Sequence, residues 1–266
     1  MKTRLENLFE GHPNNNLSIF ITAGYPKKES LLEIIPILNQ SDCDIIEIGI
    51  PFSDPLADGP VIQGSSTIAL KNGMSLKLLL EQVKQIRPFT KKPIVLMGYL
   101  NSLLKFGLEN FYQTCGDSGV DGLIIPDLPL KDFKNEHESL IKKNKLDFIF
   151  LITPSTENKR AIELAQHSSG FLYMVSSNST TGNSNTSKIN LEEKLLELKH
   201  LGLKIPILIG FGIKNSADFY KACRFSNGAI IGSAFIELVA NSNNLNDQIK
   251  QFTQSIKINK NDYSIK

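Results

Sequence analysis

Short apolar runs alternate with longer amphipathic stretches along nearly the whole chain. The apolar runs have the length and β-branched content of strands buried on both faces, and they predict eight strands, at 17–22, 45–50, 93–97, 120–125, 148–152, 170–175, 206–209 and 228–231. Apolar residues at helical spacing predict helices between them, at 1–11, 31–38, 75–86, 110–116, 132–143, 157–167, 191–200, 216–223, 234–239 and 245–256.

This alternation predicts an α/β fold, a (β/α)8 TIM barrel with an extra N-terminal helix, formed by residues 1–266 as a single domain. No change in composition marks a linker. A doubly wound open sheet is the alternative, but it usually has fewer strands and a glycine-rich turn after its first strand. Here that turn reads Ala23-Gly24-Tyr25-Pro26, so the barrel is favoured.

Composition narrows the classes of function. The chain is 41% hydrophobic and carries a formal net charge of +2, which together favour a well-packed domain and speak against a nucleic-acid partner. Its three cysteines lack metal-site spacing, so we expect neither a disulfide scaffold nor a metal site. The first residues lack the apolar core of a secretory signal, and no apolar stretch is long enough to span a bilayer. Abundant Lys, Asn and Ile suggest an AT-rich genome, and we expect a cytoplasmic or plastid-stroma protein.

The most unusual polar residue of the predicted strands is Glu47, which interrupts the apolar run at 45–50. A buried carboxylate must be paired, protonated or catalytic, because a bare charge is costly to bury. The proline-rich loop that follows holds Asp54 and Asp58. Carboxylates at a strand end and on the next loop suggest acid–base chemistry, although Glu47 alone could equally be a structural acid bonded to backbone amides.

In such a barrel the active site lies at the carboxyl ends of the strands. The prediction therefore brings one group of polar side chains to the same rim: Glu47, Asp58, Tyr99, Asn101, Asp127 and Tyr173. Glycines follow the last strands, where backbone amides and a short helix N-terminus can bind phosphate. The candidates for a phosphate site are Gly182, Gly210, Gly212, Gly232 and Ser233; a simple turn role for the glycines is the alternative.

Specific motifs then point to one family. Residues 47–63 read EIGIPFSDPLADGPVIQ, which resembles the signature of the tryptophan synthase α subunit. Further matching stretches occur in the same order at 20–26 (FITAGYP), 97–101 (MGYLN), 125–129 (IPDLP), 210–213 (GFGI) and 231–234 (IGSA). The resemblance covers essentially the whole chain except its C-terminal tail.

The resemblance implies retro-aldol cleavage of indole-3-glycerol phosphate to indole and glyceraldehyde 3-phosphate, with no cofactor in this chain. It makes Glu47 the general acid/base and Asp58 the carboxylate that binds the indole N–H. Tyr173 and Phe20 would line the pocket, with Leu100 and Leu128 as further walls.

The resemblance also implies a partner. A β subunit carrying pyridoxal phosphate would complete an α2β2 heterotetramer and receive indole for L-tryptophan synthesis. The loops at 53–59 and 101–105 would lie at that interface, and Asp54 would be an interface or turn residue.

The loop at 176–182, SSNSTTG, departs from the family pattern Ser-x-x-Gly-Val-Thr-Gly. Thr181 and Gly182 match it, and by resemblance the threonine of this lid contacts Asp58. Ser179 and Thr180 replace a glycine and a valine, and Ser177 stands where some members carry arginine. We therefore expect a lid that closes less readily and a subunit that depends more on its partner.

Two other functions compete with the lyase. The altered lid is compatible with a catalytically weak subunit kept to activate its partner. Another phosphate-binding barrel, a phosphoribosyl isomerase or indole-glycerol-phosphate synthase, is disfavoured: the first would need an acid or thiol where Thr22-Ala23 stand, and the second a catalytic lysine within an early strand.

Overall fold

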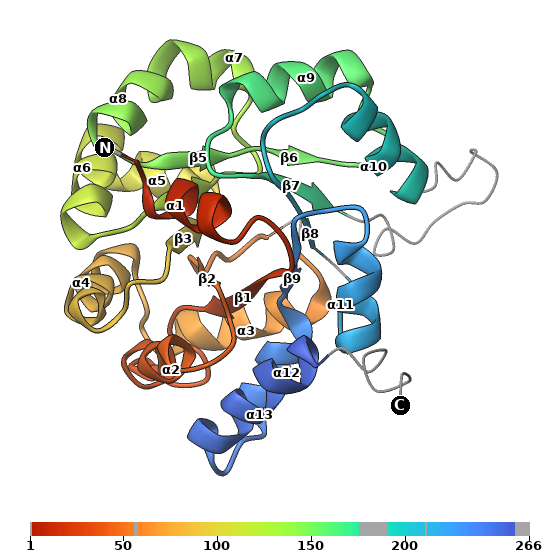
Figure 1. The fold of residues 1–266 in the computed structure, drawn as a ribbon. Coiled ribbons are helices and arrows are strands. Elements are labelled where there is room, and N and C mark those ends of the chain that lie inside the picture. The colour runs from red at the N-terminus through yellow and green to blue at the C-terminus, as the bar shows by residue number, and fades with distance from the viewer. Residues whose placement is uncertain (1, 56–57, 176–190, 211, 259–266) are drawn as a thin grey trace, which may run out of the picture.

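The computed structural model describes residues 2–55, 58–175, 191–210 and 212–258 (Figure 1). Within these residues nine strands form one parallel sheet in the order β5-β4-β3-β2-β1-β9-β8-β7-β6. Their bounds are β1 Asn16–Thr22, β2 Ile45–Gly49, β3 Ile94–Met97, β4 Gly122–Ile124, β5 Asp147–Ile149, β6 Leu151–Ile152, β7 Leu172–Val175, β8 Ile207–Gly210 and β9 Gly228–Ile231.

The two edge strands of the sheet, β5 and β6, follow each other directly in the chain. The sheet therefore curls round into a barrel, and these two strands together form its fifth strand. Strands β5 and β6 are separated only by Phe150, so β5 pairs with β4 while β6 pairs with β7. The amide of Phe150 donates to Ser168 Oγ at 3.1 Å, so in the described part of the chain this amide forms no hydrogen bond to a neighbouring strand. The predicted eight-stranded barrel is thus confirmed, with its fifth strand split in two.

Helices surround the barrel (Figure 1). The described ones are α1 Arg4–Gly11, α2 Ser30–Asn39, α3 Pro60–Lys71, α4 Leu76–Ile86, α5 Leu100–Phe106, α6 Leu108–Ser118, α7 Leu130–Asp132, α8 Glu138–Lys143, α9 Asn158–His167, α10 Leu191–His200, α11 Ser216–Cys223, α12 Ser233–Ala240 and α13 Leu245–Lys257. A π-helical turn, Phe133–His137, joins α7 to α8, and a short 3-10 turn, Arg87–Phe89, follows α4.

Helices α3 and α5 were not predicted from the sequence. The buried residues of α3 are Ser65, Ser66 and Ala69, so the apolar periodicity that marks a helix is weak there. Helix α5 begins at Leu100, inside the segment interpreted as the loop after the third strand. Most other predicted elements agree with the structure to within two residues at each end.

Side-chain alternation along the strands divides the core in two. Residues such as Ile19, Ile46 and Ile48 face the helices and belong to the large outer cluster. Alternate residues face the barrel interior and form a separate apolar cluster with the first helix: Leu5, Phe9, Phe20, Ile45, Val95, Ile124, Ile149, Phe171, Tyr173, Leu208 and Ile230. Glu47 also faces the barrel interior, because it lies two residues after Ile45 on the same strand.

Helix α1 covers the amino-terminal end of the barrel (Figure 1). A capping box formed by Thr3 and Glu6 starts the helix. Leu5 is fully buried, and the ring of Phe9 packs 6.2 Å from that of Phe171. Arg4 Nη1 donates to Asp121 Oδ1 at 2.7 Å, which ties the helix to the segment preceding β4. This end of the barrel is therefore closed by apolar side chains and an ion pair.

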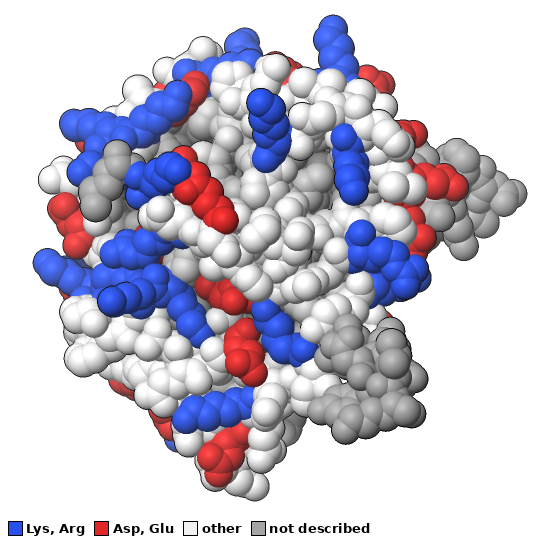
Figure 2. All heavy atoms as spheres, viewed as in Figure 1, with Lys and Arg blue, Asp and Glu red and all other residues white. Residues whose placement is uncertain are grey.

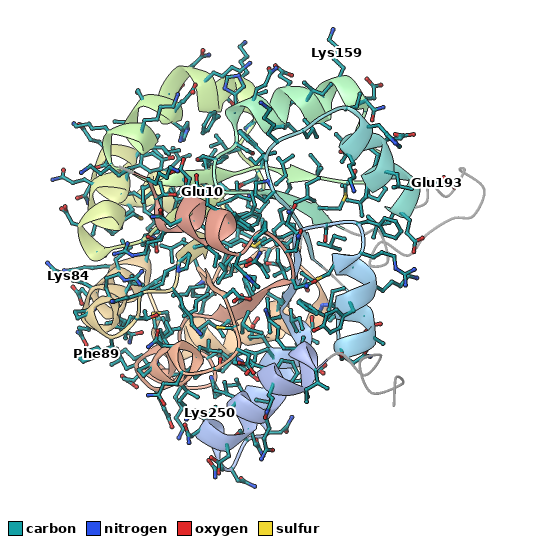
Figure 3. The ribbon with its side chains drawn as sticks, viewed as in Figure 1. Glu10, Lys84, Phe89, Lys159, Glu193 and Lys250 are labelled. Carbon is teal, nitrogen blue, oxygen red and sulfur yellow. The ribbon has the colours of Figure 1, made fainter. Side chains whose placement is uncertain are left out.

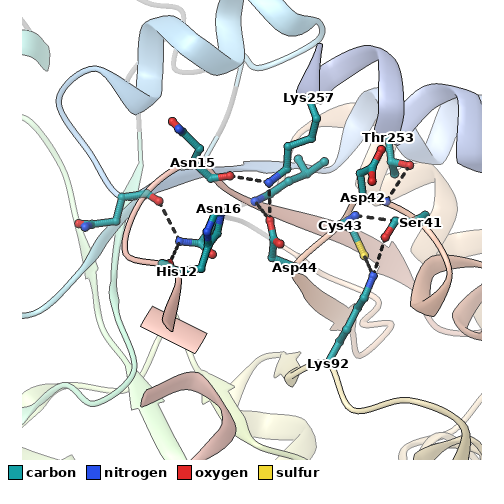
Figure 4. Close-up of polar contacts among 12 residues, drawn as sticks. His12, Asn15, Asn16, Ser41, Asp42, Cys43, Asp44, Lys92, Thr253 and Lys257 are labelled. Carbon is teal, nitrogen blue, oxygen red and sulfur yellow. Dashed lines mark hydrogen bonds and ion pairs between the residues drawn. The ribbon is translucent and has the colours of Figure 1, made fainter. Parts of the chain in front are cut away.

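A polar cluster fixes the last helix against the first strands (Figure 4). Lys257 Nζ of α13 donates to Asp44 Oδ2 and to the Asn15 carbonyl, both at 2.6 Å. The same oxygen of Asp44 accepts from the amide of Leu17 at 2.7 Å. One carboxylate thus joins the start of β1, the residue before β2 and the end of α13.

Charged side chains are distributed over the outer surface (Figure 2 and Figure 3). Lys84, Lys159 and Lys250 extend outward from α4, α9 and α13, and Phe89, which is 68% exposed, lies on the same periphery (Figure 3). On the face seen in Figure 2, basic and acidic side chains are interspersed around an area of uncharged residues. In the described part of the chain, none of the helices combines the length and apolar character that crossing a bilayer requires.

Replacing Leu5 by Ala should lower the free energy of unfolding by about 2–5 kcal/mol, because it leaves a cavity under α1. Urea denaturation measures this change. Asn7→Ala, on the exposed face of the same helix, is the control and should stay within about 0.5 kcal/mol of wild type. Equal stability of Leu5→Ala and wild type would show that α1 does not close the barrel.

Candidate active site

Glu47 lies in the middle of β2 and points into the barrel. The strand register places it beside Phe20 of β1 and Val95 of β3, and it is 0% exposed. Its Oε1 accepts a hydrogen bond from Ser18 Oγ at 2.7 Å. Its Oε2 has no hydrogen-bond partner among the described residues. The acid is therefore half satisfied, which argues against the purely structural role that would bond both oxygens.

Burial changes the acidity of Glu47. Loss of hydration raises the pKa of this carboxyl from 4.5 to about 7, and the hydrogen bond from Ser18 opposes part of that shift. A pKa near neutrality means that both protonation states are populated at physiological pH. Glu47 can therefore donate and accept a proton, as general acid–base catalysis requires.

Asp58 is the second carboxyl of the site and is partly exposed. Tyr99 donates a long hydrogen bond of 3.4 Å to its Oδ2 and stacks on Phe52, with ring centroids 5.1 Å apart. Partial burial raises the pKa of Asp58 to about 6, against the effect of the bond from Tyr99. At neutral pH Asp58 is thus mainly ionised, whereas Glu47 is poised between its two states.

A pocket opens between the carboxyl ends of the strands. It is lined by Phe20, Asp58, Ile62, Met97, Tyr173, Gly212, Ile213, Lys214, Ile230, Gly232, Ser233 and Ala234. The lining joins predicted wall residues to predicted phosphate-site residues. Glu47 is not in the lining. Burial of Tyr173 is the main cause that raises the pKa of its hydroxyl, and the negative charges of Glu47 and Asp58 raise it further. Tyr173 therefore lies close to both carboxyls.

Gly210 has a packing role next to Tyr173. A Cβ atom at this position would lie 2.1 Å from the Tyr173 hydroxyl oxygen, so any side chain would displace the tyrosine. Gly210 ends β8 and is buried, outside the pocket lining. Its predicted part in phosphate binding stays a prediction.

Three of the residues predicted to bind phosphate line the pocket: Gly212, Gly232 and Ser233. Gly212 adopts a φ of 79°, which glycine accepts most readily. Helix α12 begins at Ser233 after Gly232, and no side chain of a described residue caps its first turn. These amides can bind an anion, because the helix N-terminus carries partial positive charge.

Lys214 lines the same pocket and was not predicted from the sequence. It lies two residues after Gly212, in the loop that begins with the GFG motif. Its position in that loop could have indicated a part in phosphate binding. The sequence predicts that backbone amides and a helix N-terminus can bind the phosphate without a lysine or arginine. A lysine in the lining adds a full positive charge to that arrangement.

Several other predicted residues lie outside the pocket lining. Leu100 and Leu128 do not line it, and the exposed carboxylate of Asp127 accepts from the Leu100 amide at 2.9 Å, as a turn residue can. Asp54 is exposed beside Ser53. Thr181 and Gly182 lie outside the described residues. Among those described, no group of three or more His, Cys, Asp or Glu side chains is arranged to hold a metal ion.

Comparisons with known proteins agree on one family. A family profile described as "Tryptophan synthase alpha chain" matches residues 9–264. The tryptophan synthase alpha chain of Bacteroides fragilis is 43% identical, over 97% of this chain and 98% of the relative. That of Flavobacterium psychrophilum is 48% identical, over 83% of this chain and 87% of the relative.

This chain belongs to the tryptophan synthase alpha-chain family. Solved structures agree. Tryptophan synthase subunit alpha from Legionella pneumophila superposes with a TM-score of 0.85 at 31% identity, covering 96% of this chain and 97% of that one. A chain of tryptophan synthase from M. tuberculosis superposes with a TM-score of 0.84 at 27% identity, covering 96% of this chain and 98% of that one. The resemblance read from the motifs, the barrel and the alpha-subunit role as a carbon–carbon lyase are thus confirmed.

Glu47 should make the stability of the protein depend on pH. Its folded pKa is raised, so the ionised form is disfavoured in the folded state, and stability falls as pH rises from about 4.5 through about 7. Glu47→Gln removes this titration. Above pH 8 the free energy of unfolding of the variant should exceed that of wild type by about 3 kcal/mol, at about 1.4 kcal/mol per pKa unit. Urea denaturation at several pH values measures the difference, which should vanish near pH 4. A difference independent of pH would contradict the raised pKa.

Lys214→Gln should weaken substrate binding and leave the chemical step intact. We expect KM for the phosphorylated substrate to rise by about three- to tenfold, with kcat within about twofold, because the lysine binds ground state and transition state alike. Steady-state kinetics at low and high salt measure it. Lys204→Gln, which is outside this pocket, is the control; equal effects of the two variants would indicate only a general charge effect.

Proposed function

We propose that this chain cleaves indole-3-glycerol phosphate to indole and glyceraldehyde 3-phosphate with Glu47 as general acid/base. The observation that carries the proposal is a fully buried, half-satisfied carboxyl with a pKa near 7, next to a pocket that also holds Asp58 and Tyr173. Family membership supports the reaction, and the geometry supports the assignment of roles.

The reaction exchanges two protons and breaks one carbon–carbon bond. Glu47 delivers a proton to the indole ring carbon that bears the side chain. Removal of the proton from the adjacent glycerol hydroxyl then lets the bond to that ring carbon break, giving an aldehyde and indole. A carboxyl that has given up its proton can accept one, so Glu47 serves both steps.

Asp58 has a different part. As a mainly ionised carboxylate it accepts the indole N–H and stabilises positive charge that develops on the ring when the carbon is protonated. Phe20 and Tyr173 supply walls for the ring. The phosphate would lie against the first turn of α12, near Gly212, Ser233 and Lys214, which fixes the substrate at the end remote from the reacting carbon.

The partner we propose is a tryptophan synthase β subunit in an α2β2 heterotetramer. It would carry pyridoxal phosphate and use the released indole for L-tryptophan synthesis, while this chain needs no cofactor of its own. The proposed contact surface consists of the loop at 53–59, with Asp54, and residues 101–105, which belong to helix α5. The relatives named above come from bacteria, which favours a bacterial cytoplasm over a plastid stroma.

The lyase assay on wild type and Glu47→Gln tests the proposal. Glu47→Gln should lose at least about 10²-fold in kcat, because a general acid–base group typically contributes that much. Asp147→Asn is the matched control: it is also a buried acid with a raised pKa, but it lies in β5 at the amino-terminal end of the barrel. It should retain near wild-type kcat. Wild-type turnover by Glu47→Gln would refute the mechanism.

The same assay with and without a β subunit tests partner dependence. The substitutions at Ser177, Ser179 and Thr180 lie outside the described residues, so the weakened lid stays a prediction from sequence. Full activity of the isolated chain would contradict it. Intact substrate binding without any indole release, even with the partner, would favour the alternative of a subunit kept only to activate the β chain.

A further inference from the structure

We propose that Ser18 is a positioning residue for Glu47: its hydroxyl holds Oε1 of the acid so that Oε2 carries the transferred proton. This inference rests on the proposed function of Glu47. Ser18 belongs to none of the motifs that identify the family, and it does not line the pocket.

The location of Ser18 isolates its hydroxyl from other polar groups. It lies on β1 two residues before Phe20, so it faces the barrel interior, where it is 0% exposed. The register sets it between Ile45 of β2 and Ile230 of β9, which are both buried members of the interior cluster. Within the described residues, the hydrogen bond of this hydroxyl goes to Glu47, at 2.7 Å.

The two oxygens of Glu47 are therefore not equivalent. Oε1 is bound to Ser18, whereas Oε2 is buried without a partner among the described residues. An unpaired buried oxygen is costly, and such atoms in folded proteins call for an explanation. Assigning proton transfer to Oε2 explains why it is left open, since the substrate supplies the missing partner.

A serine hydroxyl suits an acid that must work in both protonation states. It donates to Oε1 of the ionised carboxylate, and it can still donate to Oε1, then the carbonyl oxygen of the acid, when the proton is on Oε2. A lysine or arginine in its place would hold Glu47 permanently ionised. Among the described residues, no charged group contributes to the pKa shift of Glu47. The hydroxyl fixes the position of the carboxyl and leaves it free to titrate.

Ser18→Ala tests this assignment, because it removes one buried oxygen and adds nothing. The ionisation of Glu47 is read from the infrared band of its protonated carboxyl, identified as the band that is missing in Glu47→Gln. In Ser18→Ala we expect the titration midpoint of that band to rise by about one pH unit, since a hydrogen bond to the charged form is lost. We expect kcat to fall about tenfold and KM to stay within about twofold.

Two variants complete the experiment. Ser18→Thr keeps the hydroxyl and should restore the midpoint and kcat; Ser18→Cys, a weak donor without an added methyl group, should be intermediate and covers the case in which threonine packs badly. Ser226→Ala is the control, because it removes a buried hydroxyl whose partners among the described residues are the carbonyls of Ala222 and Gly228. It should change neither quantity.

An unchanged midpoint in Ser18→Ala would overturn the proposal, and so would an equal loss of kcat in Ser226→Ala. The infrared measurement needs no turnover, so it is independent of the proposed reaction. Loss of activity in Glu47→Gln with no effect of Ser18→Ala would leave the lyase mechanism intact and refute only the role of Ser18. Retained activity in Glu47→Gln would refute the mechanism itself.

Discussion

The burial of one carboxyl group among apolar side chains is the constraint on which the proposed chemistry of this barrel depends. Glu47 sits at the level of Phe20 and Val95, where hydration is lost and a negative charge is disfavoured. The folded protein tolerates this because the acid can be neutral and because one hydroxyl is bonded to it. The same environment that weakens the fold brings the proton affinity of the group into the range that catalysis needs.

The remaining architecture keeps that environment intact. Helix α1 closes the amino-terminal end with Leu5 and Phe9, while the pocket with Asp58 and Tyr173 lies at the carboxyl ends of the strands. The division of the core into an inner and an outer cluster means that the helices can pack on the barrel without entering its interior. Glu47 and the apolar side chains that pack against the helices are thus carried by opposite faces of the same strands.

Much of this organisation could be predicted from sequence because the strand signals are strong. Alternation of apolar runs with helices indicated the barrel, and the barrel assigned Glu47 and Asp58 to one end. Other features depend on contacts between distant segments, which no local pattern reveals. Ser18 is an unremarkable serine in a strand until the structure shows its hydrogen bond to Glu47 on the neighbouring strand. Gly210 resembles a turn glycine until Tyr173 is found against it. Helix α3 was missed because small polar residues form its buried face.

The ion pair between Asp44 and Lys257 has a consequence for the order of assembly during synthesis. Asp44 precedes β2, yet its carboxylate meets a lysine that ends α13, more than two hundred residues later in the chain. Strand β1 likewise pairs with β9. During synthesis β1 therefore lacks one neighbour until β9 is made. Asp44 lacks its counter-ion until α13 is made. Such distant contacts slow folding, and the growing chain exposes the edge of β1 throughout translation.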